Sequence, residues 1–137
     1  MKKSNNKGFS LVELIIVIAI MAVLVGLLAP QYLKYVHNSK VSTDISNAQD
    51  VATALNVLFA DCEGDQTKFG TAAGSATAPS QTPDGKPLPA LKATGGSMTV
   101  NMDWNNMTGV STITDGTNEL YPDPKKAGTG YYTVNHK

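Results

Sequence analysis

Glu13 is a lone carboxylate inside an apolar stretch near the start of the chain. From Leu14 to Ala29 no residue carries a charge or a strongly polar group. A charged side chain at the centre of a membrane helix costs about 2.5–3.5 kcal/mol, so ionisable residues in such helices are functional candidates. The chemistry open to Glu13 is ion pairing. A free amine nearby and the positive end of a helix would offset part of the cost, and a partner from another chain would complete the pairing.

No other grouping of reactive side chains has the spacing of a catalytic or metal site. His37 and His136 are the only histidines, and neither belongs to a recognisable nucleophile or metal motif. Cys62 is the only cysteine, so no intrachain disulfide can form. Three further acids lack the twelve-residue calcium loop with its closing glutamate and are interpreted as solvated charges at a helix end: Asp61, Glu63 and Asp65. We therefore expect no enzyme activity, no cofactor and no bound metal.

The element that positions Glu13 has the dimensions of a membrane span. Residues 9–29 would form roughly 31 Å of helix, close to the hydrocarbon thickness of about 30 Å. Three lysines precede this run, which places the N-terminus in the cytoplasm and the rest of the chain outside: Lys2, Lys3 and Lys7. A secretory signal peptide has a shorter apolar core, of about 7–15 residues. A plain signal anchor explains the span and its orientation but gives no reason for Glu13.

The residues around Glu13 form a specific motif: Gly8-Phe9-Ser10-Leu11-Val12-Glu13-Leu14-Ile15-Ile16. With this motif the sequence resembles the type IV pilins and their relatives, the pseudopilins of type II secretion, over the leader and first helix. The resemblance implies that residues 1–8 are a prepilin leader peptide, and that a membrane prepilin peptidase cuts after Gly8 and methylates the new amine of Phe9. It also implies that Glu13 pairs with the Phe9 amine of a neighbouring subunit during filament assembly.

The same resemblance separates a hydrophobic membrane and assembly helix, 9–30, from a pilin head, 31–137. Pro30 matches the helix-kinking proline of the family, and proline bends helices because it removes a backbone hydrogen bond. Beyond it, apolar residues at steps of three and four predict an amphipathic helix over 31–60: Ile45, Ala48, Val51, Ala52, Leu55, Leu58 and Phe59. Polar residues are expected on its solvated face: Lys40, Asp44, Asn47, Asp50 and Asn56. Gly64 is expected to stop this helix.

The remaining chain predicts a loop and a sheet. Residues 61–96 are rich in Gly, Ala, Ser, Thr and Pro, which indicates a variable surface loop. Within 97–137, alternation at Met98, Val100, Met102 and Trp104 predicts a strand, Asp115-Gly116 predicts a hairpin, and Tyr131-Tyr132-Thr133-Val134 predicts a last strand. The expected fold is α+β and pilin-like. Its long helix, about 9–60, packs its C-terminal half on an antiparallel sheet of three or four strands.

The charge balance disfavours nucleic acid as an obligatory partner. Eleven Lys and Arg residues balance eleven Asp and Glu residues, whereas nucleic-acid-binding proteins gather an excess of positive charge. Removing the three leader lysines would leave eight basic against eleven acidic side chains, a mildly acidic head. A basic and aromatic cluster near the C-terminus is therefore interpreted as a solvated loop with packing tyrosines: Lys125, Lys126, Tyr131, Tyr132, His136 and Lys137.

Two classes of function fit these observations. The first is a structural subunit of a type IV pilus, inserted in the cytoplasmic membrane as a prepilin and polymerised through its helix into a surface filament for motility or adhesion. Its partners would be copies of itself, the prepilin peptidase and methylase, and the pilus assembly machinery. A type II secretion pseudopilin or a minor pilin is the alternative within this class. The second class is a membrane-tethered binding module that never polymerises.

Overall fold

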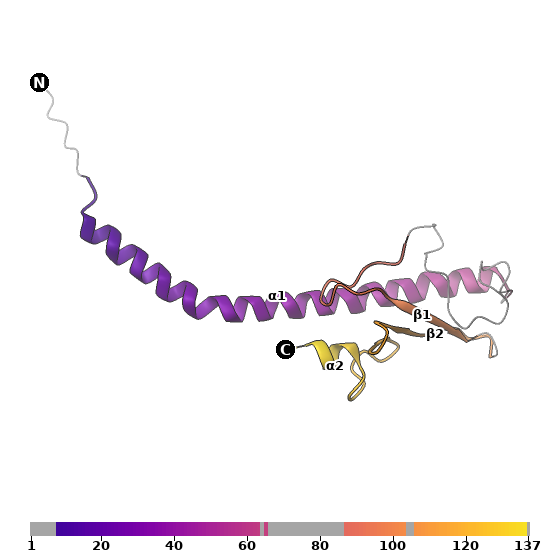
Figure 1. Ribbon diagram of the computed structural model, residues 1–137. Coiled ribbons are helices and arrows are strands. Elements are labelled where there is room, and N and C mark those ends of the chain that lie inside the picture. Colours follow the sequence, from indigo (N-terminus) through magenta and orange to yellow (C-terminus); the bar gives the residue numbers. More distant parts are fainter. Residues whose placement is uncertain (1–7, 64, 66–86, 104–105, 137) are drawn as a thin grey trace, which may run out of the picture. The chain divides into compact units, whose positions relative to one another are not determined.

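The fold combines one long helix with a small antiparallel sheet (Figure 1). The computed structural model describes residues 8–63, 65, 87–103 and 106–136. Two compact units make up the chain, Met1–Tyr35 and Val36–Lys137. The α+β prediction is confirmed by the order of elements: α1 (Leu11–Asp61), β1 (Thr99–Asp103), β2 (Gly109–Thr114), β3 (Glu119–Tyr121) and α2 (Tyr131–Asn135).

The first unit contains the apolar start of α1. Every described residue in 8–35 is exposed, and an 18-residue window of the helix reaches a mean hydropathy of 3.1. The helix begins at Leu11 rather than at Phe9, because the three residues before Leu11 are non-helical. Pro30 lies inside α1, which is helical on both sides of it. The kink expected near Pro30 stays a prediction.

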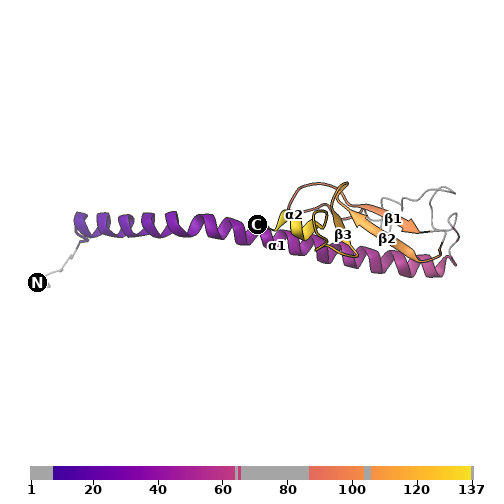
Figure 2. The same ribbon diagram turned by 90° about the horizontal axis from the view of Figure 1, so that it is seen from below.

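The second unit is built around the amphipathic part of α1. Figures 1 and 2 show the sheet and α2 alongside this part of the helix. The buried apolar residues of α1 recur at helical steps: Val41, Ala48, Val51, Ala52, Leu55 and Phe59. They share one core with residues of the sheet and of the segments beside it: Leu91, Met98, Val100, Met102, Val110, Ile113 and Leu120. This core confirms that the C-terminal half of the helix packs on the sheet.

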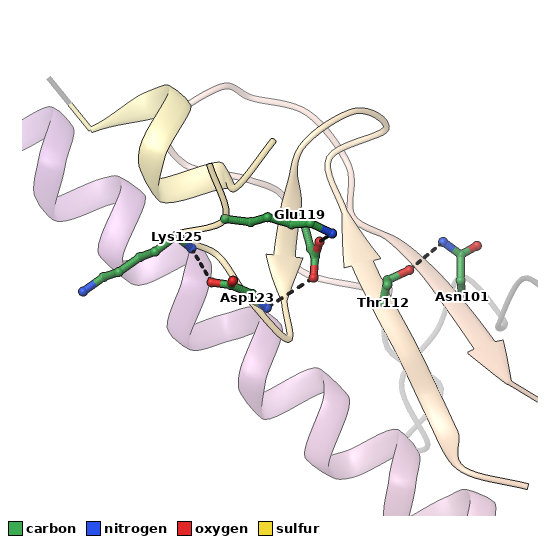
Figure 3. Close-up of polar contacts among 6 residues, drawn as sticks. Asn101, Thr112, Glu119, Asp123 and Lys125 are labelled. Carbon is green, nitrogen blue, oxygen red and sulfur yellow. Dashed lines mark hydrogen bonds and ion pairs between the residues drawn. The ribbon is translucent and has the colours of Figure 1, made fainter. Parts of the chain in front are cut away.

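The sheet has the strand order β1-β2-β3, and both neighbouring pairs are antiparallel. Asn101 Nδ2 donates to Thr112 Oγ1 at 3.1 Å and links β1 to β2 (Figure 3). Trp104, which was predicted to continue the buried row of β1, lies outside the described residues. The rest of that row is buried in the predicted alternation: Met98, Val100 and Met102.

The hairpin predicted at Asp115-Gly116 joins β2 to β3. Asp115 Oδ1 accepts the backbone N–H groups of Thr117 at 2.9 Å and Asn118 at 2.6 Å. Gly116 has a φ of 98°, a backbone conformation that favours glycine. Burial raises the pKa of the Asp115 carboxyl, but the hydrogen bonds from Asn118 and Thr117 outweigh burial and lower the pKa below its usual value.

The prediction of a last strand at Tyr131-Tyr132-Thr133-Val134 is wrong, because these residues form α2, Tyr131–Asn135. Strand alternation would place Tyr131 and Thr133 on one face, yet Tyr131 is fully buried and Thr133 is exposed. The Val134 N–H donates to Gly130 O at 3.0 Å, which is a helical bond. The packing of one tyrosine therefore overrides the strand propensity of a short segment.

The prediction that Asp44 lies on the solvated face of the helix is also wrong. Asp44 is fully buried, and its carboxylate accepts three hydrogen bonds. The Lys92 N–H donates to Oδ1 at 2.7 Å, the Ala93 N–H to Oδ2 at 2.9 Å, and the Tyr131 hydroxyl to Oδ2 at 2.9 Å. Burying a carboxylate is costly unless donors of this kind surround it.

Most of the predicted loop 61–96 lies outside the described residues, but its last part belongs to the core. Leu91 is buried, and Ala90 forms an isolated antiparallel bridge with Ser97. At the other end of the loop, α1 stops at Asp61 and Glu63 has a φ of 52°, so the described left-handed residue precedes the expected Gly64. Gly64 itself is outside the described residues.

Candidate processing and assembly segment

The start of α1 is held by side chains from its own first turn. Ser10 is the N-cap residue, and its carbonyl accepts the Leu14 N–H at 3.2 Å. Its hydroxyl accepts a long hydrogen bond from the Val12 N–H, at 3.4 Å. In return, Glu13 Oε2 accepts the Ser10 N–H at 2.9 Å. This arrangement is a variant of the capping box in which the Ser10 hydroxyl bonds to the N–H of Val12 rather than of Glu13. It satisfies N–H groups that have no partner within the helix.

The capping role of Glu13 was not predicted from the sequence. The carboxylate was interpreted only as half of an ion pair with another chain. The signal that could have revealed the second role is the spacing Ser10-x-x-Glu13 directly before an apolar run, which is the sequence signature of a capping box. Glu13 therefore has a partner within its own chain as well as the partner expected from a neighbour.

The surface that follows Glu13 is apolar and exposed in the part of the chain that the structure describes. The window of α1 that is long and apolar enough to cross a membrane has none of its residues buried. Among the described residues no other helix passes this test, which signal sequences near an N-terminus also pass. The exposed aliphatic side chains occur on all sides of the helix, as expected for a segment surrounded by lipid or by like helices: Ile15, Ile16, Val17, Ile18, Ile20, Leu24, Leu27 and Leu28.

All four predicted site residues belong to the first unit, and three of them lie at or next to the capping box: Gly8, Phe9 and Glu13. Gly8 and Phe9 are exposed and non-helical, and the Phe9 side chain is 93% exposed. Glu13 lies in the first turn of α1, and its carboxylate accepts the N–H of Ser10, the residue that follows Phe9. Pro30 lies much further along α1.

Comparison with known proteins identifies the same segment. Residues 3–29 match the family model described as the prokaryotic N-terminal methylation motif. The chain is 41% identical over 59 residues to the type IV major fimbrial protein FimA of Dichelobacter nodosus, covering 43% of this chain and 38% of that protein. It is 34% identical over 106 residues to the type IV major pilin protein PilE1 of Neisseria gonorrhoeae, covering 77% of this chain and 56% of that protein.

These matches support a place for the chain in the type IV pilin family. It spans about two fifths to three fifths of the length of these curated relatives. A fimbrial protein of Neisseria meningitidis is similar in the same way, with 33% identity over 102 residues, 74% of this chain and 58% of that protein. No solved structure matches the chain.

The second unit carries another polar centre, around Asp44. The Tyr131 hydroxyl and two backbone N–H groups converge on the Asp44 carboxylate, and both side chains are fully buried. Burial raises the pKa of Tyr131 to about 12, and the neighbouring Asp44 carboxylate also raises it. The centre joins α1, α2 and the segment before β1.

Part of the basic and aromatic cluster near the C-terminus packs upon itself. The Tyr132 and His136 rings stack at 4.3 Å between centroids, and Lys125 Nζ lies 5.1 Å from the centroid of the Tyr132 ring. His37 Nε2 lies 2.7 Å from Asn135 O, so the imidazole donates to the end of α2. The interpretation of Tyr131 as a packing tyrosine is confirmed by its full burial; Lys137 lies outside the described residues.

Polar contacts from Glu119 of β3 and within the following segment hold the connection that leads to α2 (Figure 3). Glu119 forms an ion pair with Lys126 at 3.1 Å and accepts the Asp123 N–H at 3.3 Å. Asp123 in turn accepts the Lys125 N–H at 3.1 Å. Within the part of the chain that the structure describes, no group of three or more histidine, cysteine or acidic side chains could hold a metal ion.

Proposed function

We propose that this chain is a structural subunit of a type IV pilus. The observation that carries the proposal is a wholly exposed apolar helix with one carboxylate, Glu13, at its start, inside the N-terminal methylation motif. The family relatives named type IV major pilin or fimbrial protein support this assignment over a pseudopilin or a non-polymerising tethered module. The chain acts as a filament component rather than as an enzyme.

Processing is the first step of the proposed function. The chain enters the cytoplasmic membrane as a prepilin with its N-terminus inside and its head outside, as the lysines before Phe9 favour. The prepilin peptidase removes the leader, 1–8, by cutting after Gly8, and the new amine of Phe9 is methylated. Gly8 suits the cut because a residue without a side chain lets the backbone approach a protease closely.

Assembly is the second step. With the pilus assembly machinery, the helix 9–30 moves from lipid into a bundle of like helices, so van der Waals packing and polar pairing between subunits must favour the filament. Glu13 supplies the pairing with the Phe9 amine of a neighbouring subunit. A kink at Pro30 would adjust the path of the helix. The head comprises the helix 31–60, the loop 61–96 and the region 97–137, and it lies on the surface of an extracellular filament.

Substituting Glu13 tests the assembly step. We expect Glu13→Ala to leave membrane insertion intact, because the apolar run that follows is unchanged, and to reduce surface filaments at least about tenfold if the lost pairing is worth 1.4 kcal/mol or more per subunit. Sheared filaments are quantified per cell, with the membrane-bound chain as the loading control. Undiminished filaments in the Glu13→Ala strain would refute the pairing role.

Glu13→Gln is the matched variant for this test. Glutamine preserves the size and the hydrogen-bonding capacity of Glu13 but carries no charge. We expect it to lose filaments as Glu13→Ala does, since ion pairing requires the charge. Val17→Ala, which removes apolar surface one turn further along the same exposed helix, controls for a general loss of packing and should reduce filaments less.

A further inference from the structure

The bond proposed for cleavage lies just before the capped start of α1. The residues on both sides of the Gly8–Phe9 bond are exposed and non-helical, and the helix begins at Leu11. A peptidase must reach the carbonyl and both flanks of the bond it cuts. A helix instead engages its carbonyls in internal hydrogen bonds and surrounds them with side chains. The Gly8–Phe9 bond would therefore be a poor substrate if α1 extended through it.

We propose that Ser10 and Glu13 are positioning residues for leader cleavage. Their capping box fixes the first helical residue at Leu11 and thereby keeps the Gly8–Phe9 bond outside the helix. This inference rests on the proposed function, in which that bond is cut. Neither Phe9 nor Ser10 would stop a helix by itself, since both residue types occur inside helices. The boundary depends on the hydrogen bonds that hold Ser10 in the N-cap conformation.

Glu13 then acts at two successive steps with different chemical requirements. Before cleavage its carboxylate accepts the Ser10 N–H, at 2.9 Å. After cleavage, the residue next to Ser10 carries a free amine, and the negative charge of Glu13 becomes the useful property. Capping requires only an acceptor, which glutamine also supplies. Ion pairing requires a charge, which glutamine lacks, so one conservative substitution separates the two roles.

The test measures leader removal from the full-length chain in its own membranes, with the prepilin peptidase present, by mass spectrometry over time. Glu13→Gln and Ser10→Asp keep acceptors in the capping box, and we expect both to be cleaved at close to the wild-type rate. Glu13→Leu and Ser10→Leu remove those acceptors. We expect these two variants to be cleaved on the order of fivefold more slowly, in proportion to the lost population of the capped conformation.

A second readout does not depend on the peptidase. Hydrogen exchange of the Ser10 amide is followed in the uncleaved full-length chain in detergent micelles. We expect the exchange to be faster in Glu13→Leu than in the wild type and close to the wild type in Glu13→Gln, because the acceptor of this N–H is lost only in the leucine variant. A change in peptidase recognition alone would not alter this exchange rate.

The possible outcomes separate the positioning role of Ser10 and Glu13 from the proposed processing. Equal cleavage rates in all variants would overturn the positioning role and leave the pilus proposal standing. Equally slow cleavage of Glu13→Gln and Glu13→Leu would also overturn it, because the effect would then belong to the charge. Ser10 exchange that is unchanged in Glu13→Leu would show that the capping box does not hold the amide. A wild-type chain that is never cut before Phe9 would refute the proposed processing itself and, with it, this inference.

Discussion

Tyr131 shows how a single buried residue makes the head sensitive to pH. Its ring is fully buried, its hydroxyl donates to Asp44 Oδ2 at 2.9 Å, and its pKa is raised to about 12. An unfolded tyrosine ionises near pH 10. The folded state therefore holds this proton over a range of pH in which the unfolded state releases it.

The free energy of unfolding should consequently fall as pH rises from about 10 to about 12. Because the folded pKa of Tyr131 is the higher one, its contribution is fully present below about pH 10 and is lost as the pH passes through about 12. Urea unfolding of the full chain in mild detergent, followed by circular dichroism at a series of alkaline pH values, measures this dependence. In Tyr131→Phe the slope over this range should be smaller.

Tyr35→Phe is the control for that experiment. Tyr35 is 73% exposed. Removing its hydroxyl should therefore leave the pH dependence of the free energy of unfolding the same as in the wild type. The same slope in Tyr131→Phe as in Tyr35→Phe would contradict the account of the Asp44 centre. Tyr131→Phe should also be less stable at neutral pH by about 1 kcal/mol, since the buried Asp44 carboxylate loses a donor.

Sequence patterns could not place Asp44, and the reason is physical. An acid in an amphipathic helix is normally solvated, and nothing in the local sequence distinguishes Asp44 from the exposed Asp50. Its donors come from distant parts of the chain, 48, 49 and 87 residues away. Only tertiary structure brings them together. By contrast, the Ser10 and Glu13 capping box is local and was within reach of a sequence pattern.

At the scale of elements, the junction between β2 and α1 depends on a residue without a side chain. Gly109 begins β2 with a φ of 83°, and a Cβ at this position would collide with Asn56 Oδ1. The Asn56 side chain is held in this position because its Oδ1 accepts the Val110 N–H at 2.7 Å. The strand and the helix therefore approach each other closely at Gly109.

Gly109→Ala should destabilise the head more than Gly116→Ala does. Both glycines have positive φ, so each substitution costs about 1–2 kcal/mol of backbone strain. A Cβ at Gly116 meets nothing within 4 Å, whereas one at Gly109 displaces Asn56 and costs about 1–3 kcal/mol more for the lost acceptor. Urea unfolding of the two variants gives the difference directly. Equal destabilisation would mean that Asn56 moves aside without cost.

The elements differ in how far their own local sequence determines their secondary structure. The apolar helix, the alternation in β1 and the hairpin at Asp115-Gly116 each rest on a local pattern, and each was predicted correctly. The segment 131–134 has strand-forming residues but is too short for propensity to decide its structure. In α2 the Tyr131 side chain is buried in the core and bonds to Asp44, which are contacts that the local sequence does not reveal. Long periodic segments were thus predictable, and short packed ones were not.

At the scale of the whole molecule, the two units differ in what they do with their apolar surface. The second unit buries its apolar residues in one core shared by α1 and the sheet. The first unit exposes its apolar residues, which no other described segment covers. A surface of this kind needs lipid or other copies of the chain to cover it. In the proposed function, the membrane and then the filament would provide these two environments in turn.

The central claim is that this exposed helix becomes a filament component after cleavage at Gly8–Phe9. The most direct measurement is the mass and N-terminal sequence of the subunit in filaments sheared from intact cells. The account predicts a mature chain that begins with N-methylated Phe9 and is the principal protein of the sheared material. A chain that retains Met1 in the membrane and is absent from the sheared filaments would contradict it.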